Sequence, residues 1–247
     1  MDFSIQASTQ EKLKQINEFL HAEVYPLEKL FLSHQWNTLF PELEKCRLKV
    51  KKMGLWAANM PADVGGTFTG LLDLALIGET LGQSPLGHFV FGCQAPDAGN
   101  AELLHMFGTD RQKQNWLKPL VAGEIRSCFA MTEPHTAGSN PTLLDSTAEL
   151  KNEMWHINGH KWYTTAAEGS DFTIAMVVTD PNAQKHKRAS MILVPTNTDG
   201  FELVRNISVM GSQGKGYYSH AEVKFNDCKV PKENLIGEVG SGFALAQ

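Results

Sequence analysis

The change of hydrophobic pattern near residue 125 is the feature that most constrains how this chain folds. Before it, apolar residues recur at three- and four-residue intervals, which is typical of amphipathic helices. After it, short apolar or alternating runs are separated by Gly, Asn, Asp and Pro at intervals of roughly ten residues, which is typical of antiparallel strands. The sequence therefore predicts an α+β fold, in which an N-terminal all-α helical domain precedes an antiparallel β-sandwich or barrel.

The helical half contains several distinct periodic segments. A helix is expected from about residue 9 to residue 33, kinked or divided at Pro26. A second is expected over residues 41–53, with Pro41 in its first turn. The remaining helical segments end at glycines and cover residues 71–82, 95–108 and 110–123.

The second half predicts short strands and then one more helix. The expected strands cover residues 127–131, 146–150, 154–159, 171–178, 189–194, 201–204 and 220–225. Within WHINGHKWY, the pair Asn158-Gly159 predicts a type I′ hairpin turn. The tail ends on what reads as the first turn of a new helix. The predicted domains are therefore 1–125, 126–235 and a truncated C-terminal helical domain that starts at 236.

Charge and composition narrow the classes of partner and compartment. The 22 Lys and Arg against 27 Asp and Glu give a net charge of -5, which argues against nucleic acid or an acidic membrane as partner. No apolar stretch approaches the roughly 20 residues of a spanning helix. The N-terminus lacks the pattern of a leader, and the four separated cysteines read as reduced thiols. We expect a cytoplasmic protein, or one of the mitochondrial matrix if the chain is processed.

Several common functional motifs are missing or out of context. Gly211, Gly214 and Gly216 lie between strand-like segments without a following helix, so a Rossmann fingerprint is unsupported. His156 and His160 would form a metal pair only on a helix, whereas their segment alternates like a strand. No GxSxG elbow supports a hydrolase, which stays a weak alternative.

Two segments carry the candidate chemistry. The first site segment, residues 128–140 (CFAMTEPHTAGSN), ends in small and hydroxyl residues whose backbone N–H groups can face an anion. The second site segment, residues 158–165 (NGHKWYTT), combines large aromatics with hydroxyls, as a flat heteroaromatic ligand requires. Taken alone, each segment is better explained as ordinary structure, namely a strand with its loop or a hairpin with core aromatics. Together they suggest two sides of one cofactor site.

At these residues the sequence resembles the acyl-CoA dehydrogenase family. The similar segments are MGLWAANMPADVGG, GNAELLHMFGTDRQKQNWLKPLVAGEIRS, AMTEPHTAGSN, NGHKWYTT and VPKENLIGEVGSGF, in the family's order over about two hundred residues. The spacing after Pro134 leans toward the branch that resembles the larger dehydrogenases fused to kinase-like domains. Asn140, His135 and Ala166 depart from the residues common in the family, which leaves details of the flavin and pyrophosphate contacts open.

The resemblance implies FAD as cofactor and assigns site residues by position. Met131 and Thr132 would meet the pyrimidine edge of the flavin, Tyr163 would lie against the ring, and Thr165 would bond near N5. Ser139 would contact the pyrophosphate or the acyl-CoA substrate. The implied cofactor-binding set is Phe129, Met131, Thr132, Gly138, Ser139, Tyr163 and Thr165.

The resemblance also implies a reaction, which is the conversion of an acyl-CoA thioester to the trans-2-enoyl-CoA in fatty acid metabolism. The glutamate base of the family is expected beyond Gln247, so the sequence supplies no catalytic residue and the chain alone is expected to be inactive. Electron-transfer flavoprotein is the expected electron acceptor, and the full-length protein is expected to be a homodimer or homotetramer. The alternatives are a noncatalytic binding or assembly module and a related flavoenzyme such as an acyl-CoA oxidase.

Overall fold

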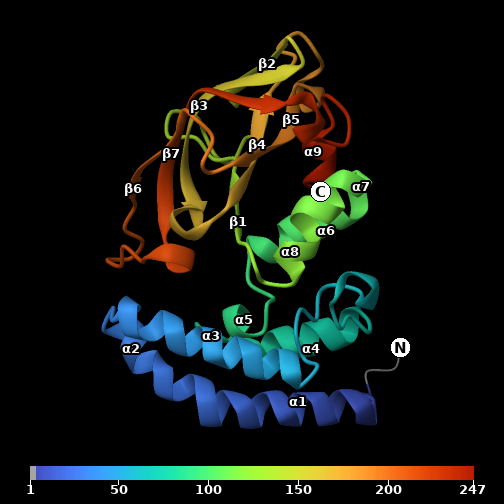
Figure 1. Cartoon of the computed structure of the whole chain (residues 1–247), viewed down its shortest axis with the longest axis vertical. Helices are drawn as coiled ribbons and strands as arrows, with labels where there is room; N and C mark the ends of the chain where they lie inside the picture. Colours follow the sequence, from blue (N-terminus) through green and yellow to red (C-terminus); the bar gives the residue numbers. More distant parts are fainter. Residues whose placement is uncertain (1–3) are drawn as a thin grey trace. The chain divides into compact units, whose positions relative to one another are not determined.

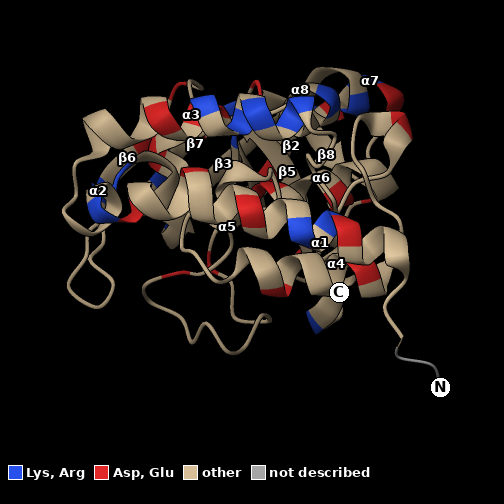
Figure 2. Ribbon diagram, turned by 90° about the horizontal axis from the view of Figure 1, so that it is seen from below, with Lys and Arg blue, Asp and Glu red and all other residues tan. Residues whose placement is uncertain are grey.

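The computed structural model describes residues 4–247, and its contacts divide the chain into two compact units (Figure 1). The first unit ends at Ala98 and the second comprises Gly99–Gln247. Within the described residues, no helix is both long and apolar enough to cross a membrane. Acidic and basic residues are interspersed along the helices of both units (Figure 2).

The first unit is helical, as predicted. Its α-helices are α1 (Ala7–Phe19), α2 (Glu28–Leu32), α3 (Trp36–Lys52), α4 (Leu71–Leu81) and α5 (Gly87–Val90). A π-helical turn at Leu20–Val24 and a 3₁₀ turn at Tyr25–Leu27 separate α1 from α2, so the predicted division at Pro26 is confirmed. Helix α3 begins at Trp36, which places Pro41 inside the helix; the prediction that Pro41 lies in the first turn was wrong.

A buried arginine organises the core of the first unit. Arg47 on α3 is 2% exposed, and its Nη1 donates to the carbonyl of Phe89 at 3.0 Å. Its guanidinium also lies 4.7 Å from the ring centre of Trp56 and 4.5 Å from that of Phe89. Such cation–π contacts strengthen when they are desolvated, so this side chain links α3 to the loop at Trp56 and to α5.

The helices of the second unit are fixed to its sheet by two buried carboxamides. These helices are α6 (Asp97–Phe107), α7 (Asp110–Gln112), a π-helical turn (Lys113–Leu117) and α8 (Lys118–Val121). Asn100 donates to Ser127 Oγ at 2.9 Å, and Gln112 donates to the carbonyls of Glu233 and Leu235, both at 2.8 Å. Because buried polar groups are costly unless bonded, these amides fix where the helices pack.

The strands of the second unit form one sheet of eight strands, mostly antiparallel, as expected for the predicted fold class. They are β1 (Ser127–Ala130), β2 (Thr147–Lys151), β3 (Met154–Thr165), β4 (Phe172–Val178), β5 (Ala189–Pro195), β6 (Phe201–Asn206), β7 (His220–Pro231) and β8 (Leu235–Ile236). The order is β6-β7-β3-β2-β4-β5-β8, with β1 pairing β4 in parallel. A last helical turn, α9 (Gly242–Leu245), follows the sheet as predicted.

The predicted hairpin at Asn158-Gly159 was wrong. Both residues lie inside β3, where the pairing with β7 shifts register between Ile157 and Gly159. The hairpin turn is instead Asn152-Glu153, between β2 and β3, and both residues have positive φ (49° and 64°) as a type I′ turn requires. Asn-Gly here marks a β-bulge, which uses the same permissive residues as a turn.

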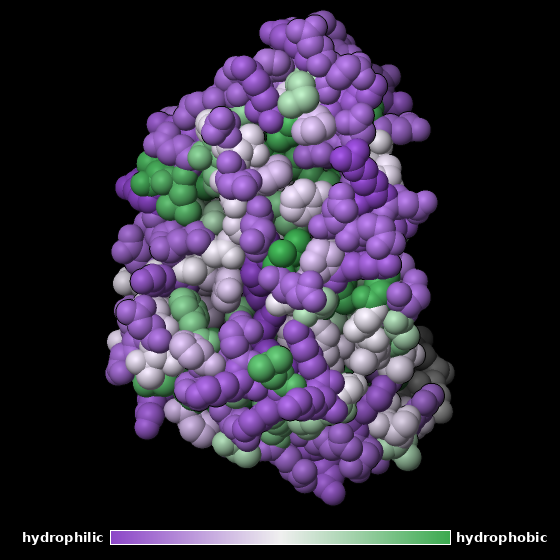
Figure 3. All heavy atoms as spheres, viewed as in Figure 1, coloured by the Kyte–Doolittle hydropathy of each residue, from purple (hydrophilic) through white to green (hydrophobic). Residues whose placement is uncertain are grey.

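The apolar core of the second unit lies between the strands that carry the site. Fifteen buried residues from six of the strands and one short turn form it, including Trp155, Ile157 and Phe225. On the face shown in Figure 3, hydrophobic residues form scattered spots among hydrophilic ones. Because β1 and β3 both contribute buried side chains to this core, packing holds the two strands in place.

The close approach at Gly159 yields a first prediction. A methyl group added there would overlap the side chain of Ser146 and come within 2.9 Å of its Cα. Gly159→Ala should therefore lower the free energy of unfolding by about 1–3 kcal/mol, because overpacking forces neighbours to shift. Urea denaturation followed by circular dichroism measures this change.

Gly99→Ala is the matched control, since nothing lies within 4 Å of its added methyl group in α6. It should leave stability unchanged or raise it by up to about 1 kcal/mol. Equal stability of the Gly159→Ala variant and the wild type would contradict the packing described here.

Candidate functional site

The structure brings the two site segments into direct contact. The backbone N–H of Trp162 donates to the carbonyl of Thr132 at 3.0 Å. Lys161 Nζ also donates to the carbonyl of Met131 at 2.9 Å. The end of β1 and the end of β3 therefore lie side by side.

A buried ion pair holds this junction. Lys161 on β3 and Glu133, just after β1, have side chains 0% and 3% exposed, and their Nζ and Oε1 atoms are 2.7 Å apart. Lys161 Nζ donates a further bond to the carbonyl of Met176 on β4 at 2.7 Å. An ammonium has three N–H donors, so all of them are used by Met131, Glu133 and Met176.

The carboxylate of Glu133 is equally well satisfied. It accepts the backbone N–H of Asp145 at 2.6 Å and that of Ser146 at 2.9 Å, in addition to Lys161. Burial alone would raise the pKa of Glu133, but the Lys161 ammonium and the backbone donors outweigh it and lower that pKa. Burial also lowers the pKa of Lys161 to about 8, against the opposing effect of Glu133.

Around the buried Glu133, the first site segment is an exposed loop. Thr132, Gly138 and Ser139 are all exposed, and an added methyl group on Gly138 would lie 3.2 Å from Thr132 Cγ2. Asn140 Oδ1 accepts from the backbone N–H of Thr142 at 3.1 Å, which closes an Asx turn. The small residue at 138 therefore lets the loop fold back over Thr132.

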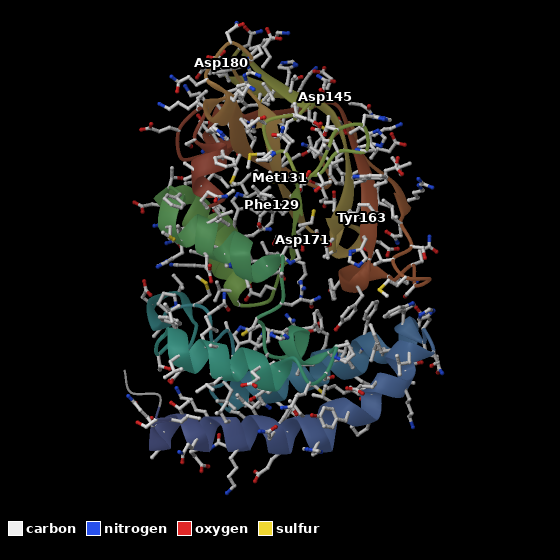
Figure 4. All side chains as sticks on the ribbon, turned by 180° about the vertical axis from the view of Figure 1, so that it is seen from behind. Phe129, Met131, Asp145, Tyr163, Asp171 and Asp180 are labelled. Atoms are coloured by element: carbon white, nitrogen blue, oxygen red, sulfur yellow. The ribbon has the colours of Figure 1, made fainter. Side chains whose placement is uncertain are left out.

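The opposite side of the junction presents an aromatic ring. Tyr163 has φ +50° and a 45% exposed side chain, and the β3–β7 register shifts between Lys161 and Thr164 around it. Its ring centre lies 5.0 Å from that of Trp162. Positive φ is uncommon for a bulky residue and marks a strained position that the surrounding structure must impose. Figure 4 shows Tyr163 on β3 across from Phe129 and Met131.

Phe129 and Met131 lie along the end of β1. Phe129 pairs with Ile174 on β4, and both Phe129 and Met131 are partly exposed. The carbonyl of Met131 is occupied by Lys161. The structure thus places both predicted residues beside the junction.

Thr165, at the end of β3, pairs with His220 at the start of β7. Its Oγ1 lies 2.9 Å from His220 Nδ1. The next residue, Ala166, is fully buried and left-handed (φ 69°, ψ 4°), which is a conformation that Asn or Gly adopts more readily. Alanine at position 166 is therefore an unfavourable residue for this backbone conformation, at a position that the sequence analysis identified as departing from the residues common in the family.

Sequence reasoning missed three residues that build the site: Lys161, Glu133 and His220. The sequence held one indication for Lys161: in the alternating pattern of its strand, this residue falls on the inward face. Among the described residues, no group of three or more His, Cys, Asp or Glu side chains is placed to hold a metal ion.

Comparison with known protein families accounts for this arrangement. The model of the acyl-CoA dehydrogenase N-terminal domain matches residues 7–124, and that of the acyl-CoA dehydrogenase middle domain matches residues 128–228. The chain belongs to the acyl-CoA dehydrogenase family. Both site segments lie within the region matched by the middle domain.

Individual relatives agree with this assignment. The chain is 39% identical over 250 residues to acyl-CoA dehydrogenase family member 11 of Gallus gallus, covering 96% of this chain and 32% of the relative. It is 36% identical over 256 residues to the probable acyl-CoA dehydrogenase FadE2 of Mycobacterium tuberculosis, covering 100% of this chain and 62% of the relative. The chain thus spans less than two thirds of either relative.

A solved structure shows the same fold. A putative acyl-CoA dehydrogenase from Mycobacterium abscessus superimposes with a TM-score of 0.93 at 35% identity, covering 99% of this chain and 64% of that one. The resemblance to the acyl-CoA dehydrogenase family and the predicted fold class are confirmed.

The buried ion pair yields a second prediction. Removing one partner of such a pair strands the other charge in the core, so Lys161→Met or Glu133→Gln should each lower the free energy of unfolding by about 3–5 kcal/mol. The double variant should lose clearly less than the sum of the two, because no unpaired charge remains. Chemical denaturation of all four proteins measures the coupling.

An exposed pair on α3 serves as control. Lys45 and Glu42 are 2.7 Å apart with side chains 65% and 40% exposed. Lys45→Met should change stability by less than about 0.5 kcal/mol. Additive losses in the Lys161/Glu133 cycle would show that the two groups do not interact in solution.

A third prediction concerns the titration of Lys161. Burial lowers its pKa from 10.5 to about 8, so its NMR resonances should titrate near pH 8 in the folded protein. The folded state then releases this proton before the unfolded chain does. The contribution of Lys161 to the free energy of unfolding should therefore rise with pH between about 8 and 10.5.

Because the Glu133 carboxylate raises the pKa of Lys161, Glu133→Gln should move the midpoint below that of the wild type. A wild-type midpoint at the ordinary lysine value would mean that Nζ is hydrated rather than buried.

Proposed function

We propose that this chain is the N-terminal and middle part of an FAD-dependent acyl-CoA dehydrogenase. The reaction is the removal of an α-proton and a β-hydride from an acyl-CoA thioester, which gives the trans-2-enoyl-CoA. The observation that carries the proposal is the junction at Lys161, where bonds to Met131 and Glu133 join the exposed loop after β1 to the strand that carries the exposed ring of Tyr163.

The residues present fit a flavin nucleotide. Tyr163 offers an exposed aromatic face, and the strained backbone beneath it keeps that face from collapsing into the core. Thr132 and Ser139 offer exposed hydroxyls and backbone donors, and Gly138 keeps the loop close to Thr132. A large planar ring with a polar edge and a phosphate tail requires this set of groups.

Each residue then has a role in holding FAD. Met131 and Thr132 would meet the pyrimidine edge of the ring, and Phe129 of β1 would belong to the same binding set. Ser139 would contact the pyrophosphate or the acyl-CoA. Tyr163 would lie against the ring, and the Thr165 hydroxyl would bond near N5. Bound FAD supplies the hydride acceptor for the dehydrogenation, and the protein fixes its position.

No carboxylate of the site segments suits proton abstraction. Glu133 is buried, paired with Lys161 and bonded to two backbone N–H groups, and these contacts lower its pKa. A general base works best with a pKa near the operating pH and a free lone pair near the substrate. Following the resemblance to the family, we assign the base to a glutamate of the family's C-terminal helical domain. We propose that this domain starts at residue 236, after a helical domain over residues 1–125 and a β-domain over residues 126–235.

The wider assignments follow from the same family. We propose an acyl-CoA as substrate, electron-transfer flavoprotein as electron acceptor, and a homodimer or homotetramer as the full-length assembly. The proposed compartment is the cytoplasm, or the mitochondrial matrix for a processed chain, and the proposed role is in fatty acid metabolism.

A fourth prediction tests the cofactor. The chain should take up FAD in a fluorescence titration, weakly because the family's third domain also contributes to the site. Tyr163→Ala should weaken that binding about tenfold, since an aromatic stacking pair contributes about 1.5 kcal/mol.

Tyr25→Ala is the control, because Tyr25 lies in the first unit and its hydroxyl bonds to Gln83 at 3.2 Å. It should bind FAD like the wild type. A folded wild-type chain that takes up no FAD would contradict the proposed cofactor, whereas equal binding by Tyr163→Ala would contradict only the role of Tyr163.

A further inference from the structure

A histidine lies directly behind the hydroxyl that is proposed to face the flavin. Thr165 and His220 are opposite each other in the β3–β7 ladder, and Thr165 Oγ1 lies 2.9 Å from His220 Nδ1. Both side chains are partly buried. The resemblance to the family assigned a role to Thr165, but none to His220.

Resting on the proposed function, we propose that His220 is a positioning residue, which orients the Thr165 hydroxyl toward the hydride-accepting atom of the flavin. A hydroxyl has one donor hydrogen and two acceptor lone pairs. The bond to Nδ1 uses either the hydrogen or one lone pair. His220 thereby decides whether Thr165 offers the site a donor or only acceptors.

The backbone holds this pair of side chains in place. On one side, the N–H of Ala166 donates to the carbonyl of Ser219 at 2.9 Å. On the other, Thr164 pairs with Ala221, which is fully buried. In addition, the carbonyl of His220 accepts from the N–H of Ile207 at 2.7 Å. The strand register therefore holds the two residues opposite each other, within reach of the bond between Oγ1 and Nδ1.

The state of the ring gives the pair its effect. Burial lowers the pKa of His220, so the imidazole is neutral at pH 7, with one donor and one acceptor nitrogen. If Nδ1 carries the hydrogen, it donates to Oγ1 and frees the Thr165 O–H to donate into the site. If Nδ1 is bare, Thr165 donates to it and offers lone pairs to the site.

These two arrangements suit different states of a flavin nitrogen. The oxidised ring has a bare N5, which accepts a hydrogen bond, and the reduced ring has an N5–H, which donates one. Removing His220 would leave the Thr165 hydroxyl free to rotate and to bond elsewhere, so both the affinity for FAD and its reduction potential should change.

The fifth prediction compares substitutions at His220. His220→Leu removes the ring nitrogen, whereas His220→Asn places an amide atom at about the position of Nδ1. We expect His220→Leu to weaken FAD binding about three- to tenfold, as for one lost hydrogen bond, and to shift the reduction potential. Thr165→Val should have effects of the same direction and similar size.

A double-variant cycle gives the decisive comparison. Because His220 is proposed to act only through Thr165, the His220→Leu/Thr165→Val protein should be no worse than Thr165→Val alone. His220→Asn should recover most of the lost affinity. His156→Leu is the matched control, since His156 lies at the other end of β3 and pairs with Asp227 at 2.7 Å; it should leave binding and potential unchanged.

A readout without FAD completes the test. In the FAD-free chain, the ¹⁵N resonance of His220 Nδ1 should report a hydrogen bond and should shift in Thr165→Val, with circular dichroism confirming that each variant is folded. An unchanged Nδ1 resonance in Thr165→Val would overturn the proposal. The proposal would also be overturned if His220→Leu kept the wild-type affinity and reduction potential while Thr165→Val changed them. That result would leave the proposed binding of FAD uncontradicted. A wild-type chain that binds no FAD would instead overturn the proposed function together with this inference.

Discussion

The buried ion pair between Lys161 and Glu133 is the interaction on which the geometry of the second unit depends. One ammonium joins the end of β1, the loop after it and the carbonyl of Met176 on β4, and its partner carboxylate fixes the start of β2 through Asp145 and Ser146. Such a pair contributes little net stability compared with apolar residues, because desolvation opposes the attraction. Its contribution is to specify how β1, β2, β3 and β4 meet, since separating the two groups would leave a charge unpaired in the core.

This constraint explains how β3 can carry an exposed aromatic next to a buried lysine. Lys161 and Thr164 are both buried, although regular alternation would turn residues three positions apart to opposite faces of the strand. The strand therefore contains one extra residue between Lys161 and Thr164, where its pairing with β7 shifts register. Tyr163 takes the positive φ that results, and its ring is left 45% exposed. Ala166 adopts a second left-handed conformation just past the strand. Thr165 therefore lies between two irregular positions, in a stretch whose direction is set by its neighbours on both sides.

Much of this fold follows from pattern alone, and the failures have identifiable causes. Hydrophobic periodicity located the helices and strands because burial imposes it directly. It could not show that Asn158-Gly159 forms a bulge rather than a turn, since both structures favour a small residue such as glycine. The choice depends on the tertiary contact that brings Ser146 close to Gly159. It also could not show that β1 pairs with β4 in parallel, which is a tertiary choice. Likewise, alternation places Lys161 on the inward face of its strand, but it could not show which carboxylate pairs with it, because Glu133 lies 28 residues away in the chain.

The site segments were recognisable from their residue types, whereas the residues that position them were not. Thr132, Ser139, Tyr163 and Thr165 are exposed or half-buried groups that a ligand can use, so their chemistry is visible in the sequence. Lys161, Glu133 and His220 act on other protein groups, and their partners lie 12 to 55 residues away in the chain. Because Glu133 is fully engaged with Lys161 and two backbone donors, its conspicuous place in the TEP turn is structural. Under the proposed function, proton abstraction would therefore belong to another carboxylate, and the residues of the two site segments would hold the cofactor.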